Sequence, residues 1–229
     1  MRAANRGTLS QLPGRFAVSH SESDSPPVSR PTRYHREKAS SIIMTNRSPD
    51  LPFEQSINPY RGCEHGCIYC YARPNHAYVD LSPGQDFESE IFCKDNAAEV
   101  LRDSLRKPSY RCRPIVLGTV TDPYQPIERE RRITRELLQV LVDCQHPFSL
   151  ITKSTLVLRD LDLIAPMARA GRASVAVSVT TLDNRLKGAV GPRARGGKER
   201  LKGGRERSRR GGPGTCRVST CVRARPPAQ

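Results

Sequence analysis

Three cysteines stand close together in the segment 58–74, which reads NPYRGCEHGCIYCYARP. Cys63, Cys67 and Cys70 follow the spacing C-x3-C-x2-C. Their glycine and polar neighbours predict a loop, and a short loop can turn three sulfurs toward one metal centre. Three thiolates suit an iron–sulfur cluster whose fourth iron stays open for a ligand, whereas a closed cluster takes four cysteines.

A structural zinc site is the alternative interpretation of these thiols. Structural zinc takes four ligands, and the fourth would have to be His65, His76 or Cys93. None of the three stands at a typical spacing for a second pair of zinc ligands, so the iron–sulfur interpretation is favoured. Three other cysteines are predicted to be isolated structural thiols, namely Cys93, Cys112 and Cys144.

The elements that must position this loop alternate between short apolar runs and amphipathic helices. The runs predict strands at 115–117, 148–152 and 175–180, and the helical periodicity predicts helices at 96–106, 128–144, 159–170 and from 182. Strands separated by single helices indicate right-handed βαβ units and a parallel sheet. Three such strands are too few to close a barrel. We therefore predict an α/β fold that is open after the third strand.

Polar residues follow each of the three predicted strands. These segments are 118–122, 152–154 and 178–181. Parallel α/β sheets carry their chemistry at the carboxyl ends of the strands, so we expect a ligand site on this edge. Lys153 emerges directly from a buried strand, which favours a functional role over a solvated one. Asp122 and Glu128, in the segment TDPYQPIE, are also candidates, although Glu128 is equally expected to open the following helix.

Composition divides the chain into three parts. Residues 1–50 are rich in Ser, Pro and Arg and predict a mostly disordered arm, and residues 51–187 form the patterned core. Residues 188–229 hold 10 Arg and 2 Lys against 2 Glu, so most of the net charge of +15 belongs to this tail. The tail is either a disordered basic segment or the out-of-frame translation of a GC-rich gene. The abrupt loss of the α/β alternation favours the second.

Several classes of protein are excluded by simple features of the sequence. No run of 18 apolar residues occurs, which predicts no membrane-spanning helix and no membrane partner. The N-terminus lacks the apolar stretch of a secretory signal. Eight cysteines in a chain of 229 residues without such a signal indicate reduced thiols and a cytoplasmic location rather than a disulfide scaffold.

The cysteine spacing, with Tyr69 directly before the third cysteine, resembles the motif of the radical S-adenosylmethionine (SAM) superfamily. The longer strings NPYRGCEHGCIYCYARP, LSPGQDFESEI, GTVTDPYQPIER, ITKS, RDLD and SVTTLD resemble a bacterial group related to spore photoproduct lyase and described as DNA-repair-photolyase-like. The resemblance covers residues 5–187 and implies a partial parallel (βα) barrel. That group continues with further strands and helices after Leu186, and the absence of this pattern favours truncation or a frameshift.

The resemblance implies a 4Fe–4S cluster held by Cys63, Cys67 and Cys70, with SAM chelated to the open iron. One-electron reduction would split SAM into methionine and a 5′-deoxyadenosyl radical. Residues expected to contact the cofactor are Tyr69 near the adenine, Gly118 and Thr119 near the methionine amino group, Lys153 on the carboxylate and Ser178 on the ribose. Arg61 and Arg73 flank the loop and are expected to make it electropositive.

The function expected from these residues is therefore a radical SAM enzyme of the lyase type, whose substrate is not indicated. A nucleic acid lesion is the specific version of this hypothesis, and a flavodoxin or ferredoxin is the expected electron donor. The basic tail supports an alternative, a nucleic-acid-binding protein whose affinity falls steeply with salt. A zinc-binding structural module is the third candidate.

Overall fold

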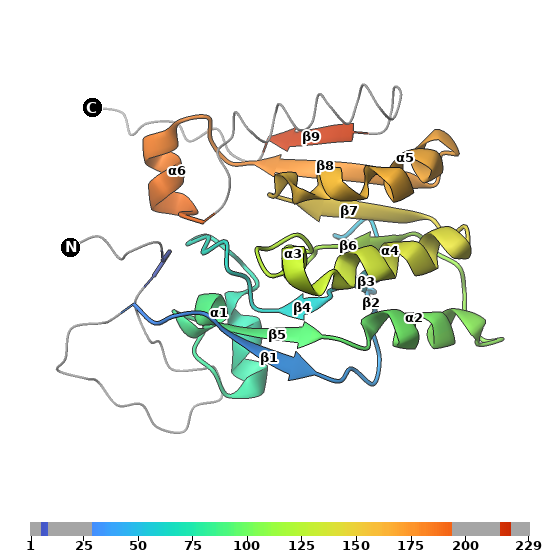
Figure 1. Cartoon of the computed structure of the whole chain (residues 1–229), viewed down its shortest axis with the longest axis horizontal. Coiled ribbons are helices and arrows are strands. Elements are labelled where there is room, and N and C mark those ends of the chain that lie inside the picture. The colour runs from blue at the N-terminus through green and yellow to red at the C-terminus, as the bar shows by residue number, and fades with distance from the viewer. Residues whose placement is uncertain (1–5, 9–28, 194–215, 221–229) are drawn as a thin grey trace.

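The computed structural model describes residues 6–8, 29–193 and 216–220, and two β-sheets organise that part of the chain (Figure 1). The larger sheet has the strand order β2-β3-β6-β7-β8-β9. Its strands are β2 Ile43–Thr45, β3 Gln55–Ile57, β6 Ile115–Leu117, β7 Phe148–Thr152, β8 Ala173–Val179 and β9 Cys216–Thr220. The smaller sheet has the order β1-β5-β4, with β1 Arg33–Glu37, β5 Glu90–Lys94 and β4 Tyr60–Arg61.

The larger sheet is parallel from β3 to β9, and only β2 runs antiparallel to its neighbour. Ile115 pairs with Phe148, which in turn pairs with Ala173, so β6, β7 and β8 begin at one level. These three are the strands that the apolar runs predicted. The α/β class and the parallel sheet are therefore confirmed, and the carboxyl ends of the strands share one edge.

Helices connect these strands. They are α2 Ala97–Arg106, α3 Glu128–Arg131, α4 Ile133–Asp143, the 3-10 helix η2 Thr155–Asp160 and α5 Leu161–Arg169. The helix predicted at 128–144 is interrupted between α3 and α4, where Arg132 has a φ of 55°. Glu128 is fully buried and accepts hydrogen bonds from the backbone N–H groups of Thr134 (3.0 Å) and Arg135 (3.3 Å), in the first turn of α4. Its carboxylate therefore stabilises the positive end of that helix.

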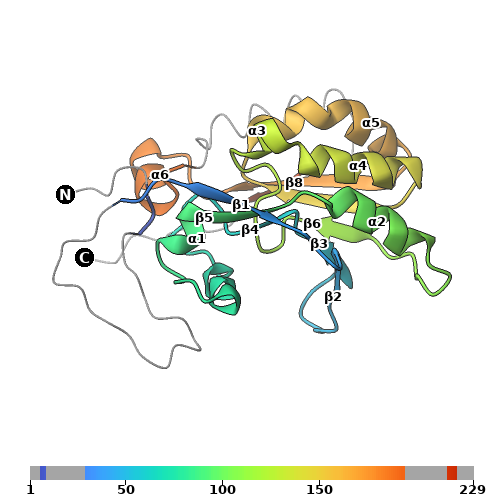
Figure 2. The ribbon, with the colours of Figure 1, turned by 60° about the horizontal axis from the view of Figure 1, so that its bottom comes forward.

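Helices α2, α4 and α5 lie on one face of the larger sheet (Figure 2). The side chains between the layers are fully or almost fully buried, and they include Leu101, Leu137, Leu141, Ile164, Ile115, Leu117, Leu150 and Val175. Each buried aliphatic side chain contributes about 1.5–3 kcal/mol relative to an exposed one. This core fixes the strands and thereby the position of the loops that follow them.

The N-terminal arm contains two strands that its composition did not predict. Strand β1 pairs in parallel with β5, and β2 pairs with β3, although the composition of residues 1–50 predicts a mostly disordered arm. Strand β1 has the sequence RYHRE, which is too polar to be recognised as a strand. Between these strands, Ile42 is 1% exposed and belongs to the main hydrophobic core. Residues 1–5 and 9–28 of the arm lie outside the described residues.

The segment after residue 187 also contributes to the sheet. Helix α6 spans Asn184–Val190, and β9 pairs in parallel with β8, from Val175 opposite Cys216 to Val179 opposite Thr220. The prediction that the sheet is open after its third predicted strand, β8, is therefore wrong. The rest of the predicted basic tail, residues 194–215 and 221–229, lies outside the described residues. No helix in the described part of the chain has the length and apolar character needed to cross a bilayer.

Candidate metal and cofactor site

The three thiols lie on one loop, residues 62–72, which connects β4 to the 3-10 helix η1 (Arg73–Val79) and is called the cluster loop below. Cys63 and Cys67 are buried and Cys70 is half-buried, and all three are free thiols. The loop turns at Gly62 and Gly66, whose φ values of 79° and 62° belong to the left-handed region that favours glycine.

The thiols are close enough to influence one another. Cys63 and Cys70 pack against the same small apolar cluster, which contains Phe87. Burial raises the pKa of Cys63, and Asp122 and Cys67 raise it further. Burial also raises the pKa of Cys67, whereas the Lys153 charge lowers it. Within the described residues, no three His, Cys, Asp or Glu side chains form a ready metal site, so the loop gathers the sulfurs without preformed coordination geometry.

Lys153 is the cation that faces these thiols. It follows β7 directly, as predicted. Burial alone would lower the pKa of Lys153, but Cys67 and Asp122 raise it, and the net pKa is above its usual value. The ammonium group is therefore charged at neutral pH, beside sulfurs that must become anionic to bind metal.

Arg61 and Arg73 do not have the expected role of flanking the thiols with positive charge. Arg61 forms an ion pair with Glu37 at 3.2 Å. Arg73 instead holds the backbone of the cluster loop, because its Nε donates to the carbonyl oxygen of Cys67 at 3.0 Å. Its other nitrogens donate to the carbonyl oxygen of Gly84 at 2.9 Å and to Glu88 Oε1 at 2.5 Å.

The buried carboxylate of Glu88 joins two distant segments to the cluster loop. Glu88 lies in α1, Asp86–Ser89, and is 0% exposed. Besides Arg73, its Oε2 accepts from the backbone N–H of Gly7 at 2.9 Å, and its carbonyl oxygen accepts from Arg6 at 2.7 Å. The described N-terminal residues therefore pack directly against the outside of the loop, next to Gly66.

A second set of contacts fixes the cluster loop to the strand-end loop, residues 118–127, which follows β6. Thr121 Oγ1 donates to the carbonyl oxygen of Gly62 at 2.6 Å, and the backbone N–H of Glu64 donates to Gln125 Oε1 at 3.1 Å. Nearby, Asn58 Oδ1 accepts from the backbone N–H of Val120 at 3.0 Å. Because these groups are buried or half-buried, the loss of any partner would leave an unsatisfied polar atom.

Gly118 permits the strand-end loop to pass close to β7. Its φ is 93°, and a Cβ at this position would lie 2.3 Å from the carbonyl oxygen of Ile151. No other residue type fits here without moving the backbone. Thr119 follows immediately, where its side chain accepts a hydrogen bond from Asn58 Nδ2 at 3.0 Å and its carbonyl oxygen accepts one from the Tyr71 hydroxyl.

Asp122 connects the strand-end loop to both β7 and the cluster loop. Its Oδ1 accepts from the backbone N–H of Tyr124 (2.9 Å) and from Thr152 Oγ1 (2.6 Å). Its Oδ2 accepts from the backbone N–H of Lys153 (2.6 Å) and lies 3.2 Å from His65 Nε2, an ion-pair distance without hydrogen-bond alignment. Burial would raise the pKa of Asp122, but the charge of His65 and these hydrogen bonds outweigh it and hold the pKa well below its usual value.

The sequence profile of the radical SAM superfamily matches residues 57–223, well over half of the chain. The chain belongs to the radical SAM superfamily. An uncharacterized protein of Mycobacterium tuberculosis (strain H37Rv) is 46% identical over 136 residues, which are 59% of this chain and 40% of that protein. An uncharacterized protein of Methanocaldococcus jannaschii is 29% identical over 155 residues, or 68% of this chain and 54% of that protein. The chain thus spans about half the length of these relatives.

Among solved structures, spore photoproduct lyase in complex with dinucleoside spore photoproduct has a TM-score of 0.55 and 14% identity, covering 81% of this chain and 49% of that one. A cysteine-to-serine mutant of the same lyase has a TM-score of 0.54, with the same identity and coverage. At this identity the similarity shows the fold alone. It agrees with the predicted radical SAM fold and with the resemblance to the spore photoproduct lyase group.

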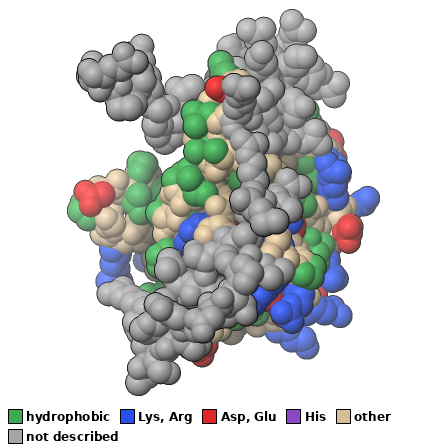
Figure 3. Space-filling model, turned by 90° about the vertical axis from the view of Figure 1, so that its left-hand side faces the viewer, with side chains coloured by type: hydrophobic (Ala, Val, Ile, Leu, Met, Phe, Trp, Pro, Cys, Tyr) green, Lys and Arg blue, Asp and Glu red, His purple; other side chains and the backbone are tan. Residues whose placement is uncertain are grey.

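The radical SAM fold brings most of the predicted cofactor residues to one edge. Tyr69 is half-exposed, its hydroxyl lies 2.9 Å from Thr180 Oγ1, and its pKa is raised by burial and by Cys67. Ser178 lies near the carboxyl end of β8, two residues before Thr180. Lys153 and the Gly118 turn follow the next two strands. In Figure 3, which faces this edge, hydrophobic side chains occupy the upper middle and most Lys and Arg lie toward the right margin.

Of the three candidate fourth ligands of a zinc site, His76 and Cys93 are placed away from the thiols, whereas His65 lies in the cluster loop. His65 faces Asp122, and His76 Nε2 lies 3.0 Å from the carbonyl oxygen of Glu90 while its ring packs on Phe87. Cys93 is buried in the main core, away from the small cluster that holds Cys63. The three free sulfurs therefore remain the donors that the iron–sulfur interpretation predicts.

Sequence reasoning missed the groups that hold the cluster loop in place. Asn58, Thr121, Gln125 and Glu88 act through contacts between segments far apart in the chain, which no local pattern reveals. Asp122 was singled out for its unusual context but without a role. One sequence feature could have indicated Asp122 and Gln125. Both follow a buried strand closely, and polar side chains that are buried there need hydrogen-bond partners.

Proposed function

We propose that this chain binds a 4Fe–4S cluster through Cys63, Cys67 and Cys70 and uses it to cleave SAM reductively. The observation that carries this proposal is the set of three free thiols on one loop that is fixed to the carboxyl edge of the sheet, with the half-buried Lys153 close enough to lower the pKa of Cys67. When bound, the cluster and SAM supply one-electron cleavage to methionine and a 5′-deoxyadenosyl radical, which takes a hydrogen atom from substrate.

The residues of the chain have separate tasks in this proposal. The three cysteines hold the metal, and because burial raises the pKa of Cys63 and Cys67, their binding to metal releases protons. Lys153 offsets the resulting negative charge and offers its ammonium group to the carboxylate of SAM. Asp122 orients Lys153 by accepting a hydrogen bond from its backbone N–H.

Further cofactor contacts are proposed for the residues around this edge. Tyr69 packs beside the adenine, Ser178 bonds the ribose, and the turn at Gly118 and Thr119 approaches the methionine amino group. The Thr119 hydroxyl is already bonded to Asn58, so its contribution to the cofactor is expected from the backbone. The part of the cluster loop around Tyr71 stays accessible to substrate and to an electron donor, because Tyr71 is 75% exposed.

The proposed enzyme is of the lyase type and cytoplasmic, reduced by a flavodoxin or ferredoxin. A nucleic acid lesion is the first substrate class to test. The fold similarity to spore photoproduct lyase supports it. The basic residues that support the alternative, nucleic-acid binding without catalysis, lie mostly outside the described residues.

The proposal is tested on the full chain purified and reconstituted without oxygen. Iron and sulfide should be present in equal amounts, and addition of SAM should change the electron-paramagnetic signal of the reduced cluster. Dithionite-reduced protein should release 5′-deoxyadenosine. Zinc without iron would contradict the proposal, and so would an electron-paramagnetic signal that does not change when SAM is added.

Single substitutions assign the ligands. Cys63→Ala, Cys67→Ala and Cys70→Ala should each lose the cluster absorbance and at least about a hundredfold of the SAM cleavage. Cys112→Ala, at an exposed cysteine outside the cluster loop, is the matched control and should retain both. Retention of cleavage by any of the three ligand variants would overturn the assignment.

A further inference from the structure

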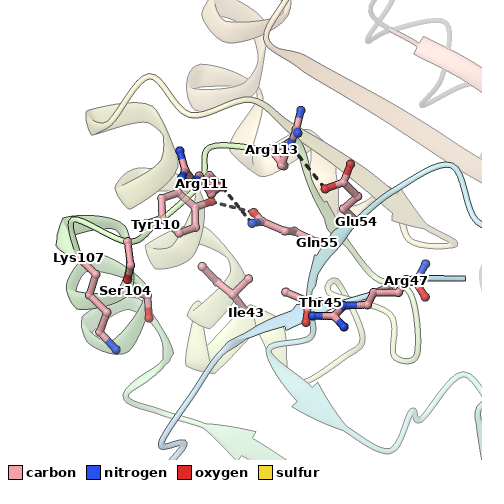
Figure 4. Close-up of a pocket in the computed structure, with 12 residues that line it drawn as sticks. Ile43, Thr45, Arg47, Glu54, Gln55, Ser104, Lys107, Tyr110, Arg111 and Arg113 are labelled. Atoms are coloured by element: carbon pink, nitrogen blue, oxygen red, sulfur yellow. Dashed lines mark hydrogen bonds and ion pairs between the residues drawn. The ribbon is translucent and has the colours of Figure 1, made fainter.

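A hollow of about 450 Å³ opens at the amino-terminal ends of β3 and β6 (Figure 4). We call it the cationic hollow. Three separate segments form its walls: the β2–β3 connection with Arg47 and Glu54, the end of α2 with Lys107, and the loop before β6 with Arg111 and Arg113. In a parallel sheet this edge is opposite to the carboxyl ends, where the cysteines and Lys153 lie.

The walls of the hollow carry a strong excess of positive charge. Four cations, Arg47, Lys107, Arg111 and Arg113, face one carboxylate, Glu54. Arg113 lies 3.5 Å from Glu54, a weak exposed pair. The other three cations form no ion pair within the described residues. All three line the hollow, and in Figure 4 Lys107 and Arg111 lie on one side of it and Arg47 on the other.

A chain of hydrogen bonds connects the residues at the base of the hollow. Gln55 is 8% exposed, and its Nε2 donates to the carbonyl oxygen of Arg111 at 3.1 Å. Its Oε1 accepts from the Tyr110 hydroxyl at 2.8 Å, and that hydroxyl lies 2.7 Å from His146 Nε2. Burial lowers the pKa of His146, so this ring adds no charge at neutral pH. The position of Arg111 is therefore fixed through its own backbone.

We propose that the cationic hollow binds a small molecule that carries a pyrophosphate group. Guanidinium groups match phosphate oxygens in geometry, and cations on opposite walls are reached together only by a ligand with more than one charged group. The volume is in the range of small-molecule sites. A nucleic acid duplex, by contrast, is bound by cations spread along an extended surface rather than around a hollow.

The test is calorimetric titration of the full chain with inorganic pyrophosphate, with ADP, with orthophosphate and with a 20-base-pair duplex. Pyrophosphate and ADP should bind with one site per chain and at least about tenfold more tightly than orthophosphate. The double variant Lys107→Gln/Arg111→Gln should weaken pyrophosphate binding at least about tenfold.

The matched control is Arg129→Gln/Arg131→Gln, which removes the same charge at exposed positions outside the hollow. It leaves binding within about twofold if the proposal is correct. Equal weakening in both double variants would reveal non-specific attraction to a basic protein and would overturn the site. So would tight binding of the duplex with no binding of pyrophosphate. Thermal unfolding of each variant verifies that the chain is folded.

Discussion

The two ends of the parallel sheet use polar residues in opposite ways. At the carboxyl end, Asp122 and Glu88 are almost fully buried, and each accepts hydrogen bonds from several segments of the chain. At the amino end, Arg47, Lys107 and Arg111 are exposed and form no ion pair within the described residues. Buried polar groups must be satisfied and therefore fix geometry, whereas exposed charges remain free to bind. The carboxyl end therefore holds the loops of the chain in position, whereas the amino end presents cations that can attract an anionic ligand.

The largest effect expected from this contrast is on Asp122. Asp122→Ala leaves the buried donors Thr152 Oγ1 and the backbone N–H of Lys153 without their acceptor, and we expect a loss of about 3–5 kcal/mol in the free energy of unfolding, measured in urea. Asp162→Ala is the control, because Asp162 is 55% exposed and pairs with Arg135 at the surface. Its expected cost is below about 1 kcal/mol. Similar losses in both variants would break the comparison.

A second prediction concerns the turn at Gly118. Gly118→Ala must move either the turn or β7, because its Cβ would lie 2.3 Å from the carbonyl oxygen of Ile151, and it should cost about 2–3 kcal/mol. Gly171→Ala has a similar φ of +70° but no atom within 4 Å of the added Cβ. It should cost only about 1 kcal/mol. Chemical denaturation of both variants measures the difference, and equal costs would show that the turn is not held tightly.

The acid dependence of stability should also originate at the carboxyl end. The pKa of Asp122 is held below its unfolded value, so its contribution is fully present above about pH 4 and is lost as the pH falls further. Asp122→Asn should flatten the decline of unfolding free energy between about pH 4 and pH 2 relative to the unmodified chain. An unchanged slope would assign the acid sensitivity to other carboxylates.

The smallest effect is expected at the cationic hollow. Lys107→Gln/Arg111→Gln removes exposed charges without ion-pair partners, so its unfolding free energy should stay within about 0.5 kcal/mol of the unmodified chain. A loss above about 2 kcal/mol would mean that these cations position the structure as Asp122 does. The distinction between the two ends of the sheet would then fail.

The sequence predicted those parts of the fold that depend on local pattern. Strands β6, β7 and β8 are apolar runs, and the cluster loop is recognisable from its cysteine spacing. Strand β1 was missed because its polar residues are held by backbone pairing with β5, and the role of Arg73 was wrong because its partner Glu88 is visible only in the folded chain. The position of Lys153 at the carboxyl edge was predictable, because the residue directly after a buried parallel strand lies at that edge of the sheet.

The aromatic residues of the cluster loop have a practical consequence for spectroscopy. The chain has 7 Tyr and no Trp, so its ultraviolet emission comes from tyrosine alone. Tyr69 and Tyr71 stand on either side of Cys70, and both are exposed, at 48% and 75%. A coloured metal centre on that cysteine would quench neighbouring emitters by energy transfer. Loading can thus be followed optically, without labels, from a signal that the protein already carries.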